Sequence, residues 1–138
     1  MTTFEPPPPD WEKLFAAAHA AREQAHAPYS KFRVGAALWL ADGSIVPGAN
    51  VENASYGLSM CAERNAVGRA VLEGKARPFA VAIVADSASP VPPCGMCRQV
   101  LAEFAGMELP VRSRNLAGIE SRYTLGELLP HAFTKSFL

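Results

Sequence analysis

The 138-residue chain has no excess of charge of either sign, because 13 lysines and arginines balance 13 aspartates and glutamates. Proteins that bind nucleic acid normally carry a basic excess or a basic patch, so this balance argues against such a partner. No apolar run approaches the length of a membrane span, and the opening MTTFEPPPPD lacks the basic start and apolar stretch of a signal peptide. We therefore expect a cytoplasmic protein that binds neither nucleic acid nor membrane.

Cysteine is scarce, since the chain has only Cys61, Cys94 and Cys97. An odd number of cysteines cannot all form disulfides within one chain, and a chain of this length can bury enough surface to fold without them. In a reducing compartment, cysteines gathered in short motifs are more often metal ligands or catalytic groups. These three residues are therefore the first candidates for a functional site.

The distribution of prolines, glycines and apolar residues indicates a single domain. We expect residues 1–9, which contain four consecutive prolines, to be a flexible N-terminal tail, and residues 10–138 to be the folded domain. The pattern predicts helices over 11–26, from about 61, over 95–104 and over 123–130, and strands over 32–40, 45–52, 79–85 and 109–113. Within the second strand, Pro47 and Gly48 indicate a sheet edge or a bulge.

The order of these elements predicts an α/β fold, with three layers (α/β/α) around a central mixed sheet. Its middle part runs strand, helix, strand, helix, strand, and right-handed crossovers make such strands parallel. The segment AVAIVA is almost continuously apolar, as expected for a strand that is covered on both faces. Both helices then begin at the carboxyl ends of strands, where α/β folds bind ligands. Cys61 and Cys94, at the starts of these helices, are expected to converge.

The segment PCGMC places Cys94 and Cys97 in a Cys-x-x-Cys turn at a helix N-terminus. This position favours ionised thiols and brings two sulfurs to one metal. Cys61 would add a third thiolate, which leaves the fourth position of a tetrahedral zinc ion open, as in catalytic sites. Glu63 follows Cys61 by two residues, close enough to hold and deprotonate a water molecule there. These residues favour a catalytic metal site.

Other interpretations of the same residues stay open on this reasoning. The Cys-x-x-Cys turn could be a redox pair, although such motifs need no third cysteine beside a glutamate. The two cysteine segments could also hold unrelated buried thiols. A structural metal site would need a fourth protein ligand, and the candidates are His19, His26 and His131.

Two segments, NVENASYGLSMCAERNA and PCGMCRQV, closely resemble the small zinc-dependent cytidine deaminases of free nucleosides. The resemblance extends from APYSKFRVGAAL to LLPHAF, which is nearly the whole chain. It implies one zinc ion per subunit, with Cys61, Cys94 and Cys97 as ligands and Glu63 as the proton shuttle. It also implies that Arg64 hydrogen-bonds ligand sulfurs, whereas the residues alone would favour a surface position for this side chain.

The resemblance also implies a nucleoside pocket. Asn50 and Glu52 are two residues apart, so on a strand they would face the same side, where an amide and a carboxylate suit the 3′-hydroxyl of a ribose. From the residues alone, Asn50 is better explained as a residue at a strand end. Arg98 and Gln99 are expected to support the site without touching substrate. The other residues expected to bind substrate are Phe32, Ala54, Tyr56 and Phe133.

Tyr56 and Phe133 would reach in from a neighbouring subunit, and the resemblance accordingly implies a homotetramer with shared sites. The implied reaction is the hydrolytic deamination of cytidine and 2′-deoxycytidine to uridine and 2′-deoxyuridine, with release of ammonia, in pyrimidine salvage.

Three rival functions are considered for the same chain. An enzyme of the same build could deaminate a modified cytosine nucleoside or a nucleoside antibiotic. A polynucleotide editor would need a groove and a basic surface. A zinc-stabilised binding module would have no use for Glu63. Without interleaved aromatic residues, we expect Arg112, Arg114, Arg122 and, more distantly, Arg98 to form a solvated face.

Overall fold

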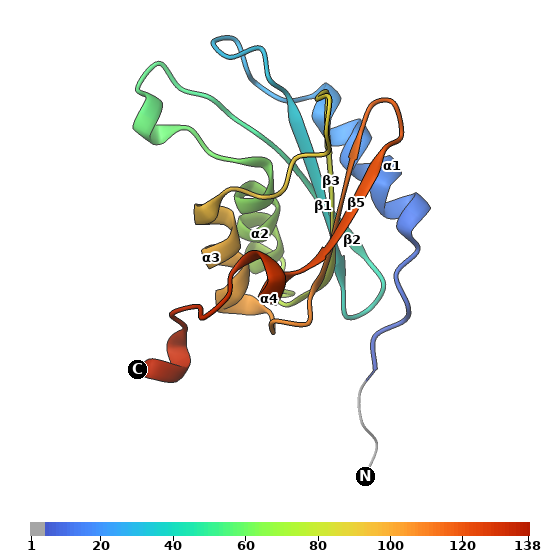
Figure 1. Ribbon diagram of the computed structural model, residues 1–138, viewed down its shortest axis with the longest axis vertical. Coiled ribbons are helices and arrows are strands. Elements are labelled where there is room, and N and C mark those ends of the chain that lie inside the picture. The colour runs from blue at the N-terminus through green and yellow to red at the C-terminus, as the bar shows by residue number, and fades with distance from the viewer. Residues whose placement is uncertain (1–4) are drawn as a thin grey trace.

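The computed structural model describes residues 5–138, so the first four residues of the expected tail lie outside the described part. Its centre is one five-stranded sheet with the strand order β2-β1-β3-β4-β5 (Figure 1). Strands β3 and β4 are parallel, and the other neighbours are antiparallel. The predicted mixed sheet is therefore confirmed. The strands are β1 (Val34–Leu40), β2 (Ile45–Ala49), β3 (Pro78–Ala85), β4 (Pro110–Asn115) and β5 (Glu120–Thr124).

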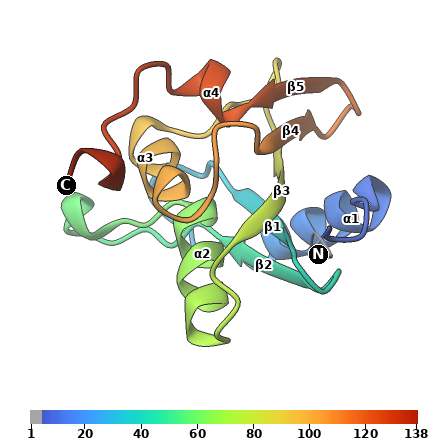
Figure 2. The ribbon, with the colours of Figure 1, turned by 90° about the horizontal axis from the view of Figure 1, so that it is seen from below.

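Helices cover both faces of the sheet, as Figure 2 shows. Helix α1 (Trp11–Glu23) packs on one face, and α2 (Ala62–Leu72) and α3 (Gly95–Phe104) lie on the other. The predicted three-layer α/β fold is confirmed. Shorter helical segments are α4 (Leu125–Leu128) and the 3₁₀ turns Tyr56–Leu58 and Lys135–Phe137. Within residues 5–138, no helix has the length and apolar character that crossing a membrane requires.

Helix α1 begins as predicted and ends earlier than predicted. The Asp10 side chain accepts a hydrogen bond from the amide of Lys13 at 3.1 Å, which caps the helix. The helix stops at Glu23 because the backbone of His26 is used elsewhere: its amide donates to the carbonyl of Asn50, and its carbonyl accepts from the amide of Glu52. This contact ties the segment before β1 to the segment after β2.

Strand β2 is an edge strand, as Pro47 and Gly48 indicated. Gly48 has a second role, because a Cβ atom there would stand 2.5 Å from both the Ala62 carbonyl oxygen and the Ala66 amide nitrogen. Asn65 donates from Nδ2 to the carbonyl of Ala49 at 2.8 Å. The first turn of α2 is therefore held in direct contact with the β2 backbone.

Strand β5 was not predicted, since residues 123–130 were expected to be one short helix. A turn with Gly118 at φ +87° reverses the chain after β4, and β5 pairs antiparallel with β4. Thr124 then begins α4 through a reciprocal capping box with Glu127. The antiparallel pairing with β4 outweighs the helical pattern over the first part of this segment.

The expectation that three nearby arginines form a solvated face is wrong for two of them. Alternation along β4 directs Arg112 and Arg114 to the face that α1 covers. Their guanidinium carbons lie 4.0 Å from the ring centroids of Trp11 and Phe15, respectively. Only Arg122 is well exposed. The first two arginines therefore hold α1 on the sheet through cation–π contacts.

Candidate metal centre and adjoining pocket

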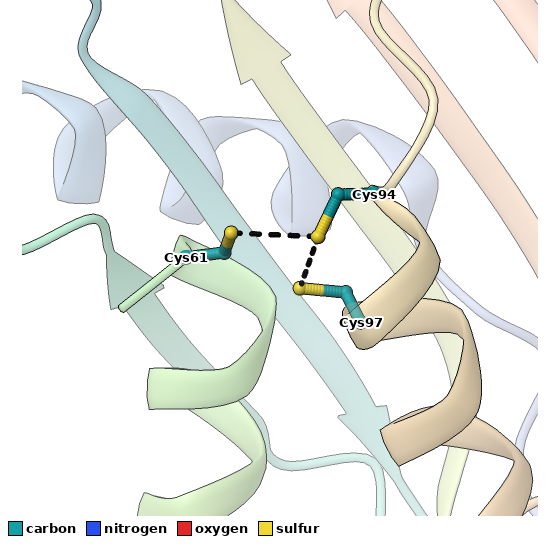
Figure 3. A group of neighbouring side chains, drawn as sticks. All are labelled: Cys61, Cys94 and Cys97. Carbon is teal, nitrogen blue, oxygen red and sulfur yellow. Dashed lines mark hydrogen bonds between the residues drawn. The ribbon is translucent and has the colours of Figure 1, made fainter. Parts of the chain in front are cut away.

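Two helix N-termini bring the three cysteines together (Figure 3). Cys61 is the N-cap residue of α2, Cys94 is the N-cap residue of α3, and Cys97 lies in the first turn of α3. The Sγ atom of Cys94 is 3.6 Å from that of Cys61 and 3.5 Å from that of Cys97. The convergence of Cys61 and Cys94 that the sequence predicts is thus observed, and it comes from the crossover of α2 and α3 onto the same end of the sheet.

The geometry of this cluster fits a tetrahedral zinc ion. With Zn–S bonds of about 2.3 Å, two ligand sulfurs of a tetrahedral site lie about 3.8 Å apart. All three Sγ atoms lie within 4.8 Å of one another. In the described part of the chain, this is the only group of three or more candidate ligands, and it includes none of the histidines. Three sulfurs leave one position of a tetrahedron for a non-protein ligand.

Cys61 is the thiol of this cluster whose pKa is lowered. A hydrogen bond from the Cys97 thiol, followed by contacts with Arg64 and Cys94, lowers the pKa of Cys61 to about 5. The same hydrogen bond, with burial, raises the pKa of Cys97. Arg64 Nη2 lies 3.7 Å from Cys61 Sγ, and that thiolate raises the pKa of Arg64. Arg64 therefore faces the cluster, as the resemblance implies.

Glu63 is a buried carboxyl beside the cluster. It lies in the first turn of α2 with only 4% of its surface exposed. Burial is the main cause that raises the pKa of Glu63, and the neighbouring charge of Cys61 adds to it. Such a group takes up a proton more readily than an exposed glutamate does.

A cavity of about 210 Å³ opens beside these residues. Cys61, Glu63 and Cys94 contribute to its wall together with Phe32 and Asn50, two of the residues expected to bind substrate. Apolar side chains complete the lining, among them Val34, Ile83 and Val91. The cavity therefore combines an apolar wall with a few polar groups at one end, which is typical of a small-molecule site.

Asn50 joins the cavity wall to the start of β1. Its Oδ1 accepts a hydrogen bond from the Val34 amide at 2.8 Å, and its Nδ2 donates to the Phe32 carbonyl at 2.8 Å. Each of these atoms can make one further hydrogen bond. Asn50 thus fixes the backbone that carries Phe32 and keeps polar capacity toward the cavity.

Glu52 lies in a neighbouring hollow, apart from Asn50. Strand β2 ends at Ala49, so strict alternation does not extend to these two residues. The Glu52 carboxylate accepts hydrogen bonds from the amides of Tyr29 and Ser30 at 3.1 Å and from the Ser30 hydroxyl. The Ser30 hydroxyl is the main cause that lowers the pKa of Glu52. Sequence reasoning missed Tyr29 and Ser30, although both lie in the segment APYS that carries the resemblance.

Besides Glu52, three more of the residues expected to bind substrate do not line the cavity within this one chain. Ala54 is exposed, and Tyr56 and Phe133 expose 75% and 62% of their surfaces. Gln99 donates from Nε2 to the Phe133 carbonyl at 2.7 Å, which places Gln99 as a support for the C-terminal segment.

Comparisons with known proteins agree on one family. The model of the cytidine and deoxycytidylate deaminase zinc-binding region matches residues 9–112. A cytidine deaminase from Halalkalibacterium halodurans is 53% identical over 125 residues, which cover 91% of this chain and 95% of that protein. A cytidine deaminase from Sporosarcina psychrophila is 51% identical over 94% of this chain and 95% of its own length. The crystal structure of cytidine deaminase from Burkholderia pseudomallei superposes with a TM-score of 0.84 at 49% identity, over 88% of this chain and 98% of that one.

Proposed function

The chain belongs to the cytidine and deoxycytidylate deaminase family, and on this premise we propose that it converts cytidine and 2′-deoxycytidine hydrolytically to uridine and 2′-deoxyuridine. Water supplies the oxygen that replaces the amino group at C4 of the pyrimidine, and ammonia leaves. The observation that carries the proposal is the buried carboxyl of Glu63 beside three converging thiols at the end of a largely apolar cavity.

One zinc ion per subunit belongs at Cys61, Cys94 and Cys97, whose spacing fits a tetrahedral ion with one position open. The ion supplies Lewis acidity, which lowers the pKa of a water molecule at the site toward neutrality. Arg64 offsets part of the negative charge of the thiolates from 3.7 Å. Without such a cation, three thiolates would leave the ion a poorer Lewis acid.

Glu63 moves the protons of the reaction. Its carboxylate takes one proton from the attacking water and delivers it to ring N3, then takes the remaining proton from the new C4 hydroxyl and delivers it to the departing amino group, which leaves as ammonia. The raised pKa of Glu63 supports this role, because the buried carboxyl accepts a proton more readily than an exposed glutamate does.

Phe32 forms an apolar wall for the pyrimidine, and Asn50 offers its remaining donor and acceptor to the ribose. Glu52 takes part from the adjoining hollow, whose lining it shares with Tyr56 and Ser59. Ala54 belongs to the same segment. Gln99 supports this pocket indirectly, since it holds the C-terminal segment at the Phe133 carbonyl.

We propose that the active unit is a homotetramer whose subunits complete one another's pockets. The exposure of Tyr56 and Phe133 supports this, because a monomer gains nothing from leaving two large aromatic side chains mostly in water. The ring of Phe133 stacks on that of Phe137, with 5.6 Å between the ring centroids, and this stacking holds Phe133 in place for a contact with a second subunit.

We also propose a cytoplasmic role in pyrimidine salvage, with residues 10–138 as the catalytic domain and residues 1–9 as a flexible tail. Three free thiols within 4.8 Å of one another stay available to a metal only where conditions are reducing, which supports the cytoplasmic assignment.

The test mixes purified protein with cytidine, 2′-deoxycytidine, cytidine monophosphate or a cytosine nucleoside antibiotic and follows deamination by the fall in ultraviolet absorbance. We expect the two plain nucleosides to be converted fastest. E63Q should keep one zinc per chain and lose activity by at least about 10²-fold to 10⁴-fold, the usual contribution of general acid–base catalysis. E73Q is the matched control, because Glu73 is a solvent-accessible carboxylate at the other end of α2.

A zinc-loaded wild type that converts neither plain nucleoside would contradict the proposed reaction. Conversion of the antibiotic alone would then identify the rival substrate class. An E63Q variant as active as E73Q would remove Glu63 from the proton transfers.

A further inference from the structure

Arg98 follows Cys97 on α3, and its side chain binds two backbone carbonyls. Arg98 Nε donates to the Pro93 carbonyl at 2.7 Å, and Nη1 donates to the Leu128 carbonyl at 2.8 Å. The guanidinium is partly buried. One planar group thus joins two segments of the chain that are far apart in sequence.

The bond to Pro93 encloses the Cys-x-x-Cys turn. Pro93 immediately precedes Cys94, and Arg98 immediately follows Cys97. The Arg98 amide also donates to the Cys94 carbonyl at 3.0 Å. The backbone and the side chain of Arg98 therefore both bind the start of the turn, at the carbonyls of Cys94 and Pro93.

The bond to Leu128 extends the connection to the C-terminal segment, residues 129–138. Leu128 is the last residue of α4, and the final carbonyls of a helix lack partners within the helix. Gln99, the next residue of α3, donates to the Phe133 carbonyl at 2.7 Å. In both views the segment after α4 runs beside α3 (Figures 1 and 2). Two consecutive residues of α3 therefore bind the residue just before the C-terminal segment and one residue within it.

We propose that Arg98 is a positioning residue that sets the Cys94–Cys97 turn and couples metal affinity to the order of residues 129–138. Arginine is required because its rigid fork of N–H donors can bind two carbonyls in fixed directions, whereas a lysine ammonium is a single point of attachment. Binding linkage then acts in both directions: a bound metal orders the C-terminal segment, and an ordered segment strengthens metal binding. This inference rests on the zinc site of the proposed function.

The test compares R98M and R98K with R69M and R69K. Arg69 is the matched control, because it is exposed on α2 and, within residues 5–138, forms one ion pair, with Glu73 at 3.5 Å. Zinc affinity is measured by competition with a chromophoric chelator, and site geometry by the absorption spectrum of the cobalt(II)-substituted protein. We expect R98M to bind zinc about 10-fold to 100-fold more weakly, the usual effect of losing a group that orients a ligand. R98K should fall between R98M and the wild type, and both Arg69 variants should match the wild type.

Hydrogen exchange of residues 129–138 is the second readout, and a purely structural role for Arg98 would not produce its pattern. In the wild type, removal of zinc should speed exchange in this segment. In R98M, exchange should be fast with or without zinc. If R98M fails to fold, R98K decides the question by the same two measurements.

Unchanged zinc affinity and an unchanged cobalt spectrum in the folded Arg98 variants would overturn the inference. So would exchange in residues 129–138 that does not respond to zinc in the wild type. A wild type that fails to bind one zinc per chain would instead overturn the proposed function, so the two failures are distinguishable.

Discussion

Replacement of Gly48 by alanine tests whether the contact between β2 and α2 sets the geometry of the metal centre. The new Cβ would stand 2.5 Å from the Ala62 oxygen and the Ala66 nitrogen, whereas ordinary contact begins at 3.4 Å. The first turn of α2 must therefore move away from β2 by about 0.9 Å, the difference between these distances. Both obstructing atoms are backbone, so no side chain can rotate to make room.

This displacement has a predictable effect on stability and on activity. Overpacking of this kind costs roughly 1–3 kcal/mol, and the lower chain entropy of an unfolded alanine offsets about 0.4–1 kcal/mol of it. Cys61 and Glu63 lie in the turn that moves. The loss of catalytic rate should therefore be larger than the modest loss of folding stability alone would suggest. A misplacement of about 1 Å can cost on the order of 10²-fold in rate.

The assay combines kcat/KM for cytidine, zinc content and urea unfolding. G68A is the control, because Gly68 lies on the same helix and, among the described residues, no atom outside its own stretch of helix backbone comes within 4 Å of the added methyl group. We expect G68A to keep full activity and to gain up to about 1 kcal/mol of stability from its better helix propensity. If G48A keeps wild-type activity and stability, the reasoning that places α2 through Gly48 is refuted.

Two further predictions concern other contacts. N50D should raise KM by roughly tenfold, or about 1.4 kcal/mol, at unchanged zinc content, because a carboxylate cannot donate to the Phe32 carbonyl as Nδ2 does. Steady-state kinetics and zinc analysis measure this effect, and an unchanged KM would contradict it. The second prediction concerns Asp42, whose pKa is held well below its usual range by hydrogen bonds from Ser44 and then Lys75. Ionised Asp42 therefore stabilises the folded protein at pH values above about 4, its pKa in the unfolded chain, and this stabilisation is lost as the pH falls further. D42N should therefore melt at a lower temperature than the wild type at pH 7, and the gap should narrow below about pH 4; an equal gap at pH 7 and pH 3 would argue against this contribution.

The sequence by itself determined the chemistry of the site. Cys61 with Glu63, and Cys94 with Cys97, are neighbours in the chain, and each pair is held within the first turn of one helix whatever the rest of the fold does. The order of strands and helices then predicted the three-layer fold and the meeting of the two helix N-termini. These features depend on local spacing and on apolar periodicity, which side chains encode directly.

The tertiary structure alone decided how these parts are fastened to one another. Arg112 and Arg114 pack on α1, Asn50 binds the backbone on either side of residue 33, and Arg98 binds the carbonyls of Pro93 and Leu128. Every residue offers the same carbonyl, so no side-chain pattern identifies which one a distant donor will reach. The length of β2 and the pairing of β5 likewise follow from contacts across the sheet, which outweigh local propensity.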